Sequence, residues 1–242
     1  MLWLRSALFV VLLALVTAFY AVVVFCLMWL PFDRLYGVPK AWARTLLWLL
    51  KVVCGLDYRI EGQENLPDRP FISMWKHSST WETIAQMIVV PPASWILKRE
   101  VLWIPLVGWA VMRFRPIAID RGAGARAVNQ VVRQGSERLA SGLGVIIYPE
   151  GTRTAPGQTR KYGISGALLA TESGAPVVPV AHNSGYFWRR RGLIKHPGVV
   201  RVVIGPPIDP AGLTPREVNA RVQAWIEASI TEIVAQPGGK PG

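Results

Sequence analysis

Cysteine and histidine are scarce in this chain of 242 residues, which contains two cysteines and three histidines. Cys26 and Cys54 lie in apolar stretches near the N-terminus and form neither a Cys-x-x-Cys pair nor a cluster with histidine. This pattern argues against a disulfide framework and against a zinc site, so we expect no metal. The sequence also contains no internal repeat or low-complexity tract. Its length therefore fits one large domain, or one domain plus an anchor.

Acidic residues are few, because 15 Asp and Glu stand against 27 Lys and Arg and give a net charge of +12. Such a charge is typical of proteins with an anionic partner: nucleic acid, an anionic lipid surface or a phosphorylated substrate. The chain also contains 11 tryptophans, which favour membrane–water interfaces. The combination favours lipid over nucleic acid. The mean hydropathy of +0.30 is too low for a protein with several membrane spans.

Charge is missing altogether between Arg5 and Asp33. As a helix this run would be about 40 Å long, enough to cross a hydrocarbon core of about 30 Å. The run ends in the bulky sequence "FCLMWLPFD" rather than at a small-residue cleavage site, which favours a retained anchor over a cleaved signal peptide. Positive charge mostly follows the run, so a spanning helix would leave the rest of the protein on the cytoplasmic side of the membrane. Alternatively, this helix and the one that follows it could enter one leaflet of the membrane and return to the same side.

Residues 38–56 predict an amphipathic helix. One stripe carries Lys40, Arg44 and Lys51, and the opposite side carries Trp42, Leu46, Leu49 and Val53. Such a helix suits the headgroup layer of a membrane. The alternative is a helix packed on its own domain with the basic face in water. We assign residues 1–56 to a membrane anchor followed by this helix.

The pattern changes after residue 56, where short β-rich runs alternate with helical stretches. The expected strands are 71–76, 94–98, 114–120, 144–149, 175–181 and 199–205, and the expected helices are 82–90, 100–112, 124–141, 165–173 and 215–234. This alternation predicts an α/β domain over residues 57–236, with a mixed, mostly parallel sheet flanked by helices. Thr214 and Pro215 form a good start for the last helix. Residues 237–242 are expected to be a disordered tail.

Polar residues follow several expected strands, and α/β folds bind ligands at the carboxyl ends of their strands. His77 follows one strand and Glu82 begins the next helix, within "WKHSSTWETI". A neutral imidazole that donates a hydrogen bond from one ring nitrogen to a carboxylate has its other nitrogen free as a base. The alternative is a glutamate that only favours the helix dipole. A serine hydrolase at Ser78 or Ser79 is disfavoured, since neither lies in a G-x-S-x-G elbow.

A second strand end carries residues 150–153, "EGTR". Gly151 would let backbone amides approach an anion, and Arg153 has a guanidinium that matches phosphate oxygens. Arg160 and Lys161 would extend the positive field. The alternative is a surface turn with a solvated arginine. A third strand end, "VVPVAHNSG" (177–185), contains a proline typical of an edge or irregular strand, and a histidine, His182, that we interpret as structural or pocket-lining.

Together these stretches resemble the glycerolipid acyltransferase family, and in particular its members that acylate 1-acylglycerol 3-phosphate. The four blocks of the family occur in order as "HSSTWE" (77–82), "KREVLWIPLVGWAVMRFRPIAIDR" (98–121), "EGTR" (150–153) and "VVPVAHNSG" (177–185). The resemblance covers roughly residues 57–210, and four blocks in order are a specific signal. The first block usually ends in aspartate, whereas this chain has Glu82. Glutamate occurs there in some members, so the resemblance still implies an active enzyme.

The resemblance implies transfer of a fatty acyl group from a thioester to the hydroxyl of a lysophospholipid, as in phospholipid synthesis. His77 would be the general base and Glu82 would orient it. Arg153 would hold the substrate phosphate with Glu150, Gly151 and Thr152 as the remainder of its loop. Further candidates for contacts with this anion or with the donor's phosphates are Lys98, Arg121 and Lys161. The implied donor is a cosubstrate, acyl-CoA or acyl carrier protein, and no other cofactor is implied.

Two rival functions fit parts of the sequence. The acceptor could be another lysolipid, such as a lyso-ornithine lipid or a lysophospholipid with a larger headgroup. Alternatively, the chain could be a non-enzymatic membrane protein that binds anionic lipid, which accounts for its charge and anchor but not for His77 beside Glu82 at a strand end. In each case the expected partners are a membrane surface and a lipid.

Overall fold

The computed structural model of the chain describes residues 1–241, without the side chain of Arg121. Seven strands form one sheet: β1 (Leu56–Glu61), β2 (Ile72–Trp75), β3 (Ala93–Lys98), β4 (Ile117–Ile119), β5 (Gly144–Ile147), β6 (Val177–His182) and β7 (Gly198–Ile204). Their order in the sheet is β1-β7-β6-β2-β5-β3-β4. Neighbouring strands are parallel except for β6 and β7, which are antiparallel. The predicted mixed, mostly parallel sheet is therefore confirmed.

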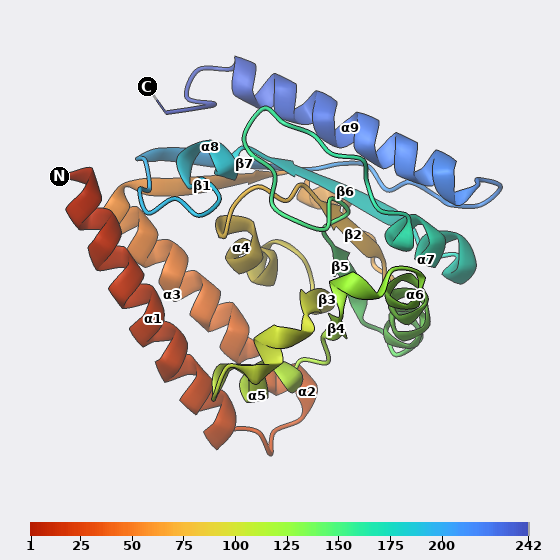
Figure 1. Cartoon of the computed structure of the whole chain (residues 1–242), viewed down its shortest axis with the longest axis horizontal. Coiled ribbons are helices and arrows are strands. Elements are labelled where there is room, and N and C mark those ends of the chain that lie inside the picture. The colour runs from red at the N-terminus through yellow and green to blue at the C-terminus, as the bar shows by residue number, and fades with distance from the viewer. Residues whose placement is uncertain (242) are drawn as a thin grey trace.

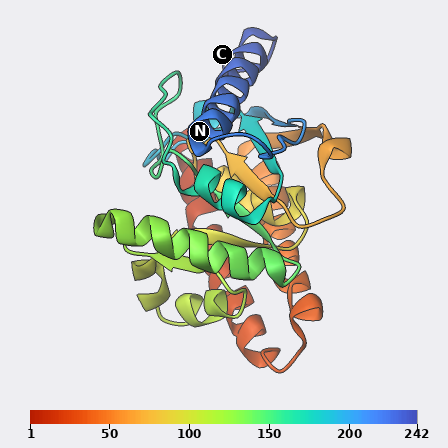
Figure 2. The same ribbon diagram turned by 90° about the vertical axis from the view of Figure 1, so that its right-hand side faces the viewer.

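Helices cover both faces of the sheet (Figures 1 and 2). One layer contains α1 (Leu2–Cys26), α2 (Phe32–Leu35), α3 (Gly37–Cys54), α4 (Trp81–Val89) and α5 (Val107–Met112), and the other contains α6 (Ala125–Ala140), α7 (Ser165–Ser173) and α9 (Pro215–Ala235). Short connections are α8 (Ser184–Phe187) and the 3₁₀ turns η1 (Gln63–Asn65), η2 (Arg99–Trp103) and η3 (Arg121–Ala123). Within β5, Ile146 packs toward the first layer, and Val145 and Ile147 pack toward the second. Burial on both faces explains why the strand is apolar throughout.

The two long N-terminal helices lie side by side along the domain (Figure 1). Hydrogen bonds join them, because Trp42 Nε1 donates to Thr17 Oγ1 over 3.2 Å and the hydroxyl groups of Tyr20 and Thr45 are 3.0 Å apart. Near the start of α1, Ser6 Oγ accepts a hydrogen bond from the backbone of Lys195. Within the described residues, α1 is the one helix long and apolar enough to cross a membrane. In this structure it is attached to the domain along its length.

The apolar side of α3 packs on the protein itself. Leu46, Leu47 and Leu50 are buried in the same cluster as side chains of α4 and the sheet. The expectation that this face lies in the headgroup layer is therefore wrong, and the alternative of a helix packed on its own domain holds. Only the outer side of α3 is available to a membrane, and it includes the exposed Trp48 and Val52.

Three local expectations also differ from the structure. The helix expected over 100–112 is divided into η2 and α5, because Pro105 lacks an N–H group and disfavours helical geometry in the residue before it. Pro179 lies in β6, which is interior in the sheet, at a point where the antiparallel ladder with β7 has not yet begun. The expected disordered tail is ordered at least to Gly239, whose carbonyl accepts a hydrogen bond from Asn183. Residue 242 lies outside the described residues.

Candidate active site

The candidate site forms where β2 and β5 end. These strands are parallel neighbours, so the segments that follow them emerge at the same edge of the sheet. Lys76 and His77 follow β2, and the segment from Tyr148 to Thr154 follows β5. The backbone of His77 contacts the second segment directly, because its carbonyl accepts a hydrogen bond from the N–H of Thr154 over 2.8 Å. The structure thus brings together two of the strand ends identified in the sequence.

Glu82 reaches back from the first turn of α4 to the ring of His77, and the distance from His77 Nδ1 to Glu82 Oε1 is 2.9 Å. The same oxygen accepts hydrogen bonds from the backbone N–H groups of Ser78 and Ser79. The loop between the strand and the helix therefore wraps around the carboxylate. The longer side chain of glutamate, compared with aspartate, is accommodated in this arrangement.

The environment of Glu82 keeps its carboxyl group ionised, although the residue is fully buried. Burial alone would raise the pKa of Glu82, but the hydrogen bond from His77, the nearby His182 and the backbone of Ser79 lower this pKa to about 2. An ionised carboxylate only accepts hydrogen bonds, so the proton between the two residues belongs to His77 Nδ1. In the neutral form of the imidazole, the other ring nitrogen, Nε2, then carries no proton and can act as a base.

Tyr148 holds the ring of His77 from one side. The two rings stack with their centroids 4.3 Å apart, and the Tyr148 hydroxyl donates to Gln86 Oε1 over 2.7 Å. Burial raises the pKa of Tyr148 well above its ordinary value, so the residue remains a neutral phenol. The orientation of the imidazole is therefore set both by packing and by Glu82.

The fourth sequence block supports Glu82 from the opposite side. Ser184 donates from its hydroxyl to Glu82 Oε2 over 3.0 Å and also lies 2.9 Å from His182 Nδ1. The other nitrogen of His182 lies 2.9 Å from the carbonyl oxygen of Lys76, and burial lowers the pKa of His182. This geometry supports the interpretation of His182 as structural. Ser184, two residues beyond His182, has no role among the sequence predictions, because its contact with Glu82 joins residues 102 positions apart.

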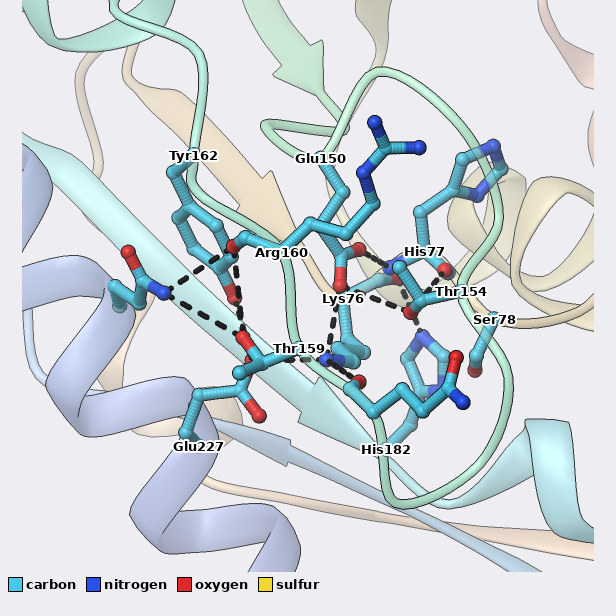
Figure 3. Close-up of polar contacts among 12 residues, drawn as sticks. Lys76, His77, Ser78, Glu150, Thr154, Thr159, Arg160, Tyr162, His182 and Glu227 are labelled. Atoms are coloured by element: carbon cyan, nitrogen blue, oxygen red, sulfur yellow. Dashed lines mark hydrogen bonds and ion pairs between the residues drawn. The ribbon is translucent and has the colours of Figure 1, made fainter.

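The carboxylate of Glu150 points toward Lys76 and the backbone of His77 (Figure 3). Its carboxylate pairs with Lys76 Nζ at 2.8 Å, and it accepts hydrogen bonds from the backbone of His77 and the hydroxyl of Thr154. Lys76 also pairs, at 2.8 Å, with Glu227 of α9. We expected Glu150 as part of the phosphate-binding loop of Arg153; its own carboxylate is buried and already paired, so it is not placed to contact a phosphate directly. The structure instead assigns Glu150 to positioning the loop that carries His77.

We expect Lys76→Met to destabilise the protein strongly. The Lys76 side chain is 5% exposed and that of Glu150 is not exposed at all, so the substitution leaves a buried carboxylate without its partner. The expected loss in the free energy of unfolding is about 3–5 kcal/mol, measured by denaturant titration. A control is Arg59→Met, which removes a 74% exposed side chain 3.7 Å from Glu61 and should cost less than about 1 kcal/mol. Equal effects of the two substitutions would contradict this account of the ion pair.

Arg153 lies on the other side of its loop and lines an apolar cavity of about 370 Å³ together with His77. Gly151 allows the loop to turn, since its φ of 67° is one that other residues rarely adopt. Among the described residues the Arg153 side chain has no hydrogen-bond or ion-pair partner, and its Nε is buried. A buried nitrogen without a hydrogen-bond partner is costly, so this half-buried guanidinium is suited to an anionic ligand in the cavity.

The remaining candidate residues are distributed around the site. Lys98 lines the same cavity, although its ammonium group pairs with Glu100 at 2.9 Å. Thr152 faces a second hollow, of about 380 Å³, beside the start of α6. Lys161 is exposed and is not among the described residues that line either hollow. The side chain of Arg121 lies outside the described residues.

Comparison with known proteins identifies the family. The model of the Acyltransferase family matches residues 57–183, which include His77, Glu82 and the loop of Arg153. The chain belongs to the acyltransferase family. This confirms the family resemblance seen in the sequence, and the fold that surrounds the site is also that of known acyltransferases.

Three similar proteins illustrate this relationship. The chain is 43% identical over 208 residues to 1-acyl-sn-glycerol-3-phosphate acyltransferase of Pseudomonas aeruginosa, covering 84% of this chain and 81% of that one. It is 31% identical over 155 residues to the lyso-ornithine lipid O-acyltransferase of the same organism, with 62% and 58% covered. The crystal structure of the 1-acyl-sn-glycerophosphate acyltransferase PlsC of Thermotoga maritima superimposes with a TM-score of 0.81 at 23% identity, covering 97% of this chain and 96% of that one.

Proposed function

We propose that this acyltransferase moves a fatty acyl group from a thioester to the sn-2 hydroxyl of 1-acylglycerol 3-phosphate, which yields phosphatidate for phospholipid synthesis. The observation that carries the proposal is that His77 and Arg153 line the same apolar cavity. A base and an unpaired cation beside an apolar hollow match the hydroxyl, the phosphate and the acyl chain of such an acceptor. The relative that is 43% identical carries the name of this activity.

The proposed reaction is a direct transfer. The Nε2 atom of His77 takes the proton of the acceptor hydroxyl while the oxygen attacks the thioester carbonyl. Glu82 stabilises the imidazolium that forms, since its buried carboxylate is ionised. When the carbon–sulfur bond breaks, the proton passes from the imidazolium to the departing thiolate. No acyl-enzyme forms, so Ser78 and Ser79 need no nucleophilic role, and their backbone N–H groups hold Glu82.

Arg153→Ala is expected to raise the KM for the lysophosphatidate acceptor by at least about tenfold, because a charge-assisted contact with phosphate is lost. The KM for the thioester donor should change much less. The measurement is initial rates with each substrate varied in turn, in detergent. Arg126→Ala, which removes an exposed arginine from α6, is the matched control and should change neither KM. Equal increases in the two KM values of the Arg153 variant would count against its contact with the acceptor.

The acceptor is tested by offering several lysolipids to the detergent-purified protein with labelled acyl-CoA or acyl carrier protein. The proposal predicts the highest kcat/KM for lysophosphatidate. Preference for a lyso-ornithine lipid would instead favour the activity for which the 31% identical relative is named. Lack of transfer to every acceptor, with vesicle binding intact, would favour the non-enzymatic alternative.

The proposed location is the cytoplasmic membrane, with the catalytic domain on its cytoplasmic side. The outer side of α1 is apolar and exposed, including Leu8, Leu15 and Phe19, while its inner side is attached to the domain. A bilayer would cover this outer side. Such a location places the enzyme where a lipid acceptor and a water-soluble thioester meet.

A further inference from the structure

A second group of exposed apolar residues lies in residues 103–112, which begin at the end of η2 and include α5, and which we call the 103–112 loop. Its large side chains are exposed: Trp103 by 69%, Ile104 by 48%, Leu106 by 42%, Trp109 by 55% and Met112 by 49%. Apolar residues scattered singly on a surface need no explanation, but a contiguous group of this kind marks an interaction site. The group includes two tryptophans, the residue type enriched at membrane–water interfaces.

The backbone of the 103–112 loop is tight and strained. Leu106 has φ of 62° and ψ of −54°, at the centre of a γ-turn in which the Val107 N–H donates to the Pro105 carbonyl over 2.7 Å. This geometry is rare for residues other than glycine, and strain of this kind collects at functional sites. Gly108 packs so closely on the backbone of Leu102 that a Cβ atom would lie 2.2 Å from its carbonyl oxygen. The fold thus holds an exposed leucine at the tip of a defined turn.

This loop adjoins the C-terminal end of α1, as Figure 1 shows for α5. Arg113 Nη2, just after α5, donates to the carbonyl of Met28, just after α1. Met28 and Trp29 are themselves exposed, by 44% and 76%. The apolar outer side of α1 and the 103–112 loop are therefore continuous. Exposed Arg113 and Arg115 border this surface, where they would meet the phosphates of lipid headgroups.

The inner sides of the same two elements form walls of the apolar cavity that contains His77. On the side of α1 these walls are Thr17, Tyr20, Ala21 and Val24, and on the side of α5 they are Val107, Ala110 and Val111. Each element therefore presents one side to the cavity and another side to the exterior. A bilayer against both exteriors would allow an acyl chain to pass from lipid into the cavity without crossing water.

We propose that the 103–112 loop is a second membrane-inserting element, which lies in the interfacial layer of the bilayer beside α1 and borders the entrance of the cavity. The partner is the lipid bilayer itself, as the tryptophans, the apolar tip and the flanking arginines indicate. The part of the proposal that concerns acceptor entry rests on the proposed function. The membrane contact does not.

The contact is tested with single labelled cysteines in the full chain, reconstituted in vesicles of phosphatidylcholine and phosphatidylglycerol. Exposed Cys26 is first replaced by Ser, while Cys54 is buried and stays. A polarity-sensitive fluorophore is placed by Trp103→Cys, by Trp109→Cys, or by Glu232→Cys on the exposed side of α9. We expect nitroxide groups on the lipid acyl chains to quench the labels at 103 and 109 but not the label at 232. Equal, weak quenching at all three positions would overturn the proposal.

Entry of the acceptor is tested with the Trp103→Gln and Trp109→Gln double variant. The KM for lysophosphatidate presented in vesicles should rise at least about tenfold, because two interfacial anchors are lost. The kcat on a short-chain, monomeric acceptor should not change, since neither tryptophan lines the cavity. Val199→Gln, which changes an exposed apolar residue elsewhere, is the control. An unchanged KM for lysophosphatidate in vesicles would overturn the proposal that the acceptor enters beside this loop.

A wild-type protein that is inactive on lysophosphatidate would contradict the proposed function. The quenching experiment would still decide whether the 103–112 loop contacts the membrane.

Discussion

Replacing His77 by alanine is expected to lower kcat for acyl transfer by about a hundred- to ten-thousand-fold, the usual contribution of a positioned general base. Among the described residues that line the cavity, His77 is the only histidine, and its hydrogen bond to Glu82 leaves Nε2 free as a base when the ring is neutral. An alcohol is a poor nucleophile until a base takes its proton. The loss should therefore appear in kcat at saturating concentrations of both substrates.

Binding to vesicles and thermal stability distinguish this chemical role from a structural one. Alanine removes the contacts of the ring with Glu82 and Tyr148, but it keeps the backbone contacts of His77 with Glu150 and Thr154, which hold the loop. The variant should therefore bind anionic vesicles as the wild type does. A His77→Ala protein with near wild-type turnover would exclude the imidazole from the mechanism. Loss of vesicle binding together with turnover would indicate damage to the fold.

Replacing Glu82 by glutamine is expected to lower kcat by at least about a hundredfold, because the negative charge that stabilises the imidazolium is lost. The geometry around the residue makes this substitution informative. An amide oxygen can still accept from His77 Nδ1 and from the N–H groups of Ser78 and Ser79, and the amide NH₂ can donate to Ser184. The glutamine variant should thus fold normally, and its lower kcat should result from the loss of the negative charge alone.

Glu82→Asp is the matched variant, since it keeps the charge and shortens the side chain by one methylene. We expect a smaller loss of kcat than with glutamine, because the carboxylate still faces His77 but from a greater distance. Both variants are compared at saturating substrates, with thermal unfolding as the control for structure. Full activity of Glu82→Gln would remove the charge of Glu82 from the mechanism.

Much of the fold could be predicted because buried strands and helices have distinct patterns. The six apolar runs expected to be strands correspond to β2–β7. The first strand, β1, was missed since only Leu56 is fully buried in it, so its sequence "LDYRIE" lacks a clear apolar run. The surroundings of the N-terminal helices could be predicted only in part. An amphipathic face fits a membrane or a neighbouring domain equally well, and only packing shows that α3 faces the domain.

The candidate site was predictable where its partners are close in sequence. His77 and Glu82 are five positions apart, so a turn into α4 is enough to join them. Other contacts could not be predicted from neighbouring residues, because they join distant parts of the sequence. Lys76 and Glu227 are 151 positions apart, and Ser184 and Glu82 are 102 positions apart. The direction of a side chain in a loop is likewise absent from the sequence. Glu150 and Arg153 share one short loop and face opposite sides of it.

The most direct test of the central claim is the position of the proton on the His77 ring. The chain has three histidines, so nitrogen NMR of the labelled protein in detergent can be assigned by comparison with His77→Ala. The account predicts that neutral His77 carries its proton on Nδ1, toward Glu82, and leaves Nε2 bare to accept the lipid hydroxyl proton. A neutral ring with its proton on Nε2 would contradict the account, because that nitrogen could not then act as the base.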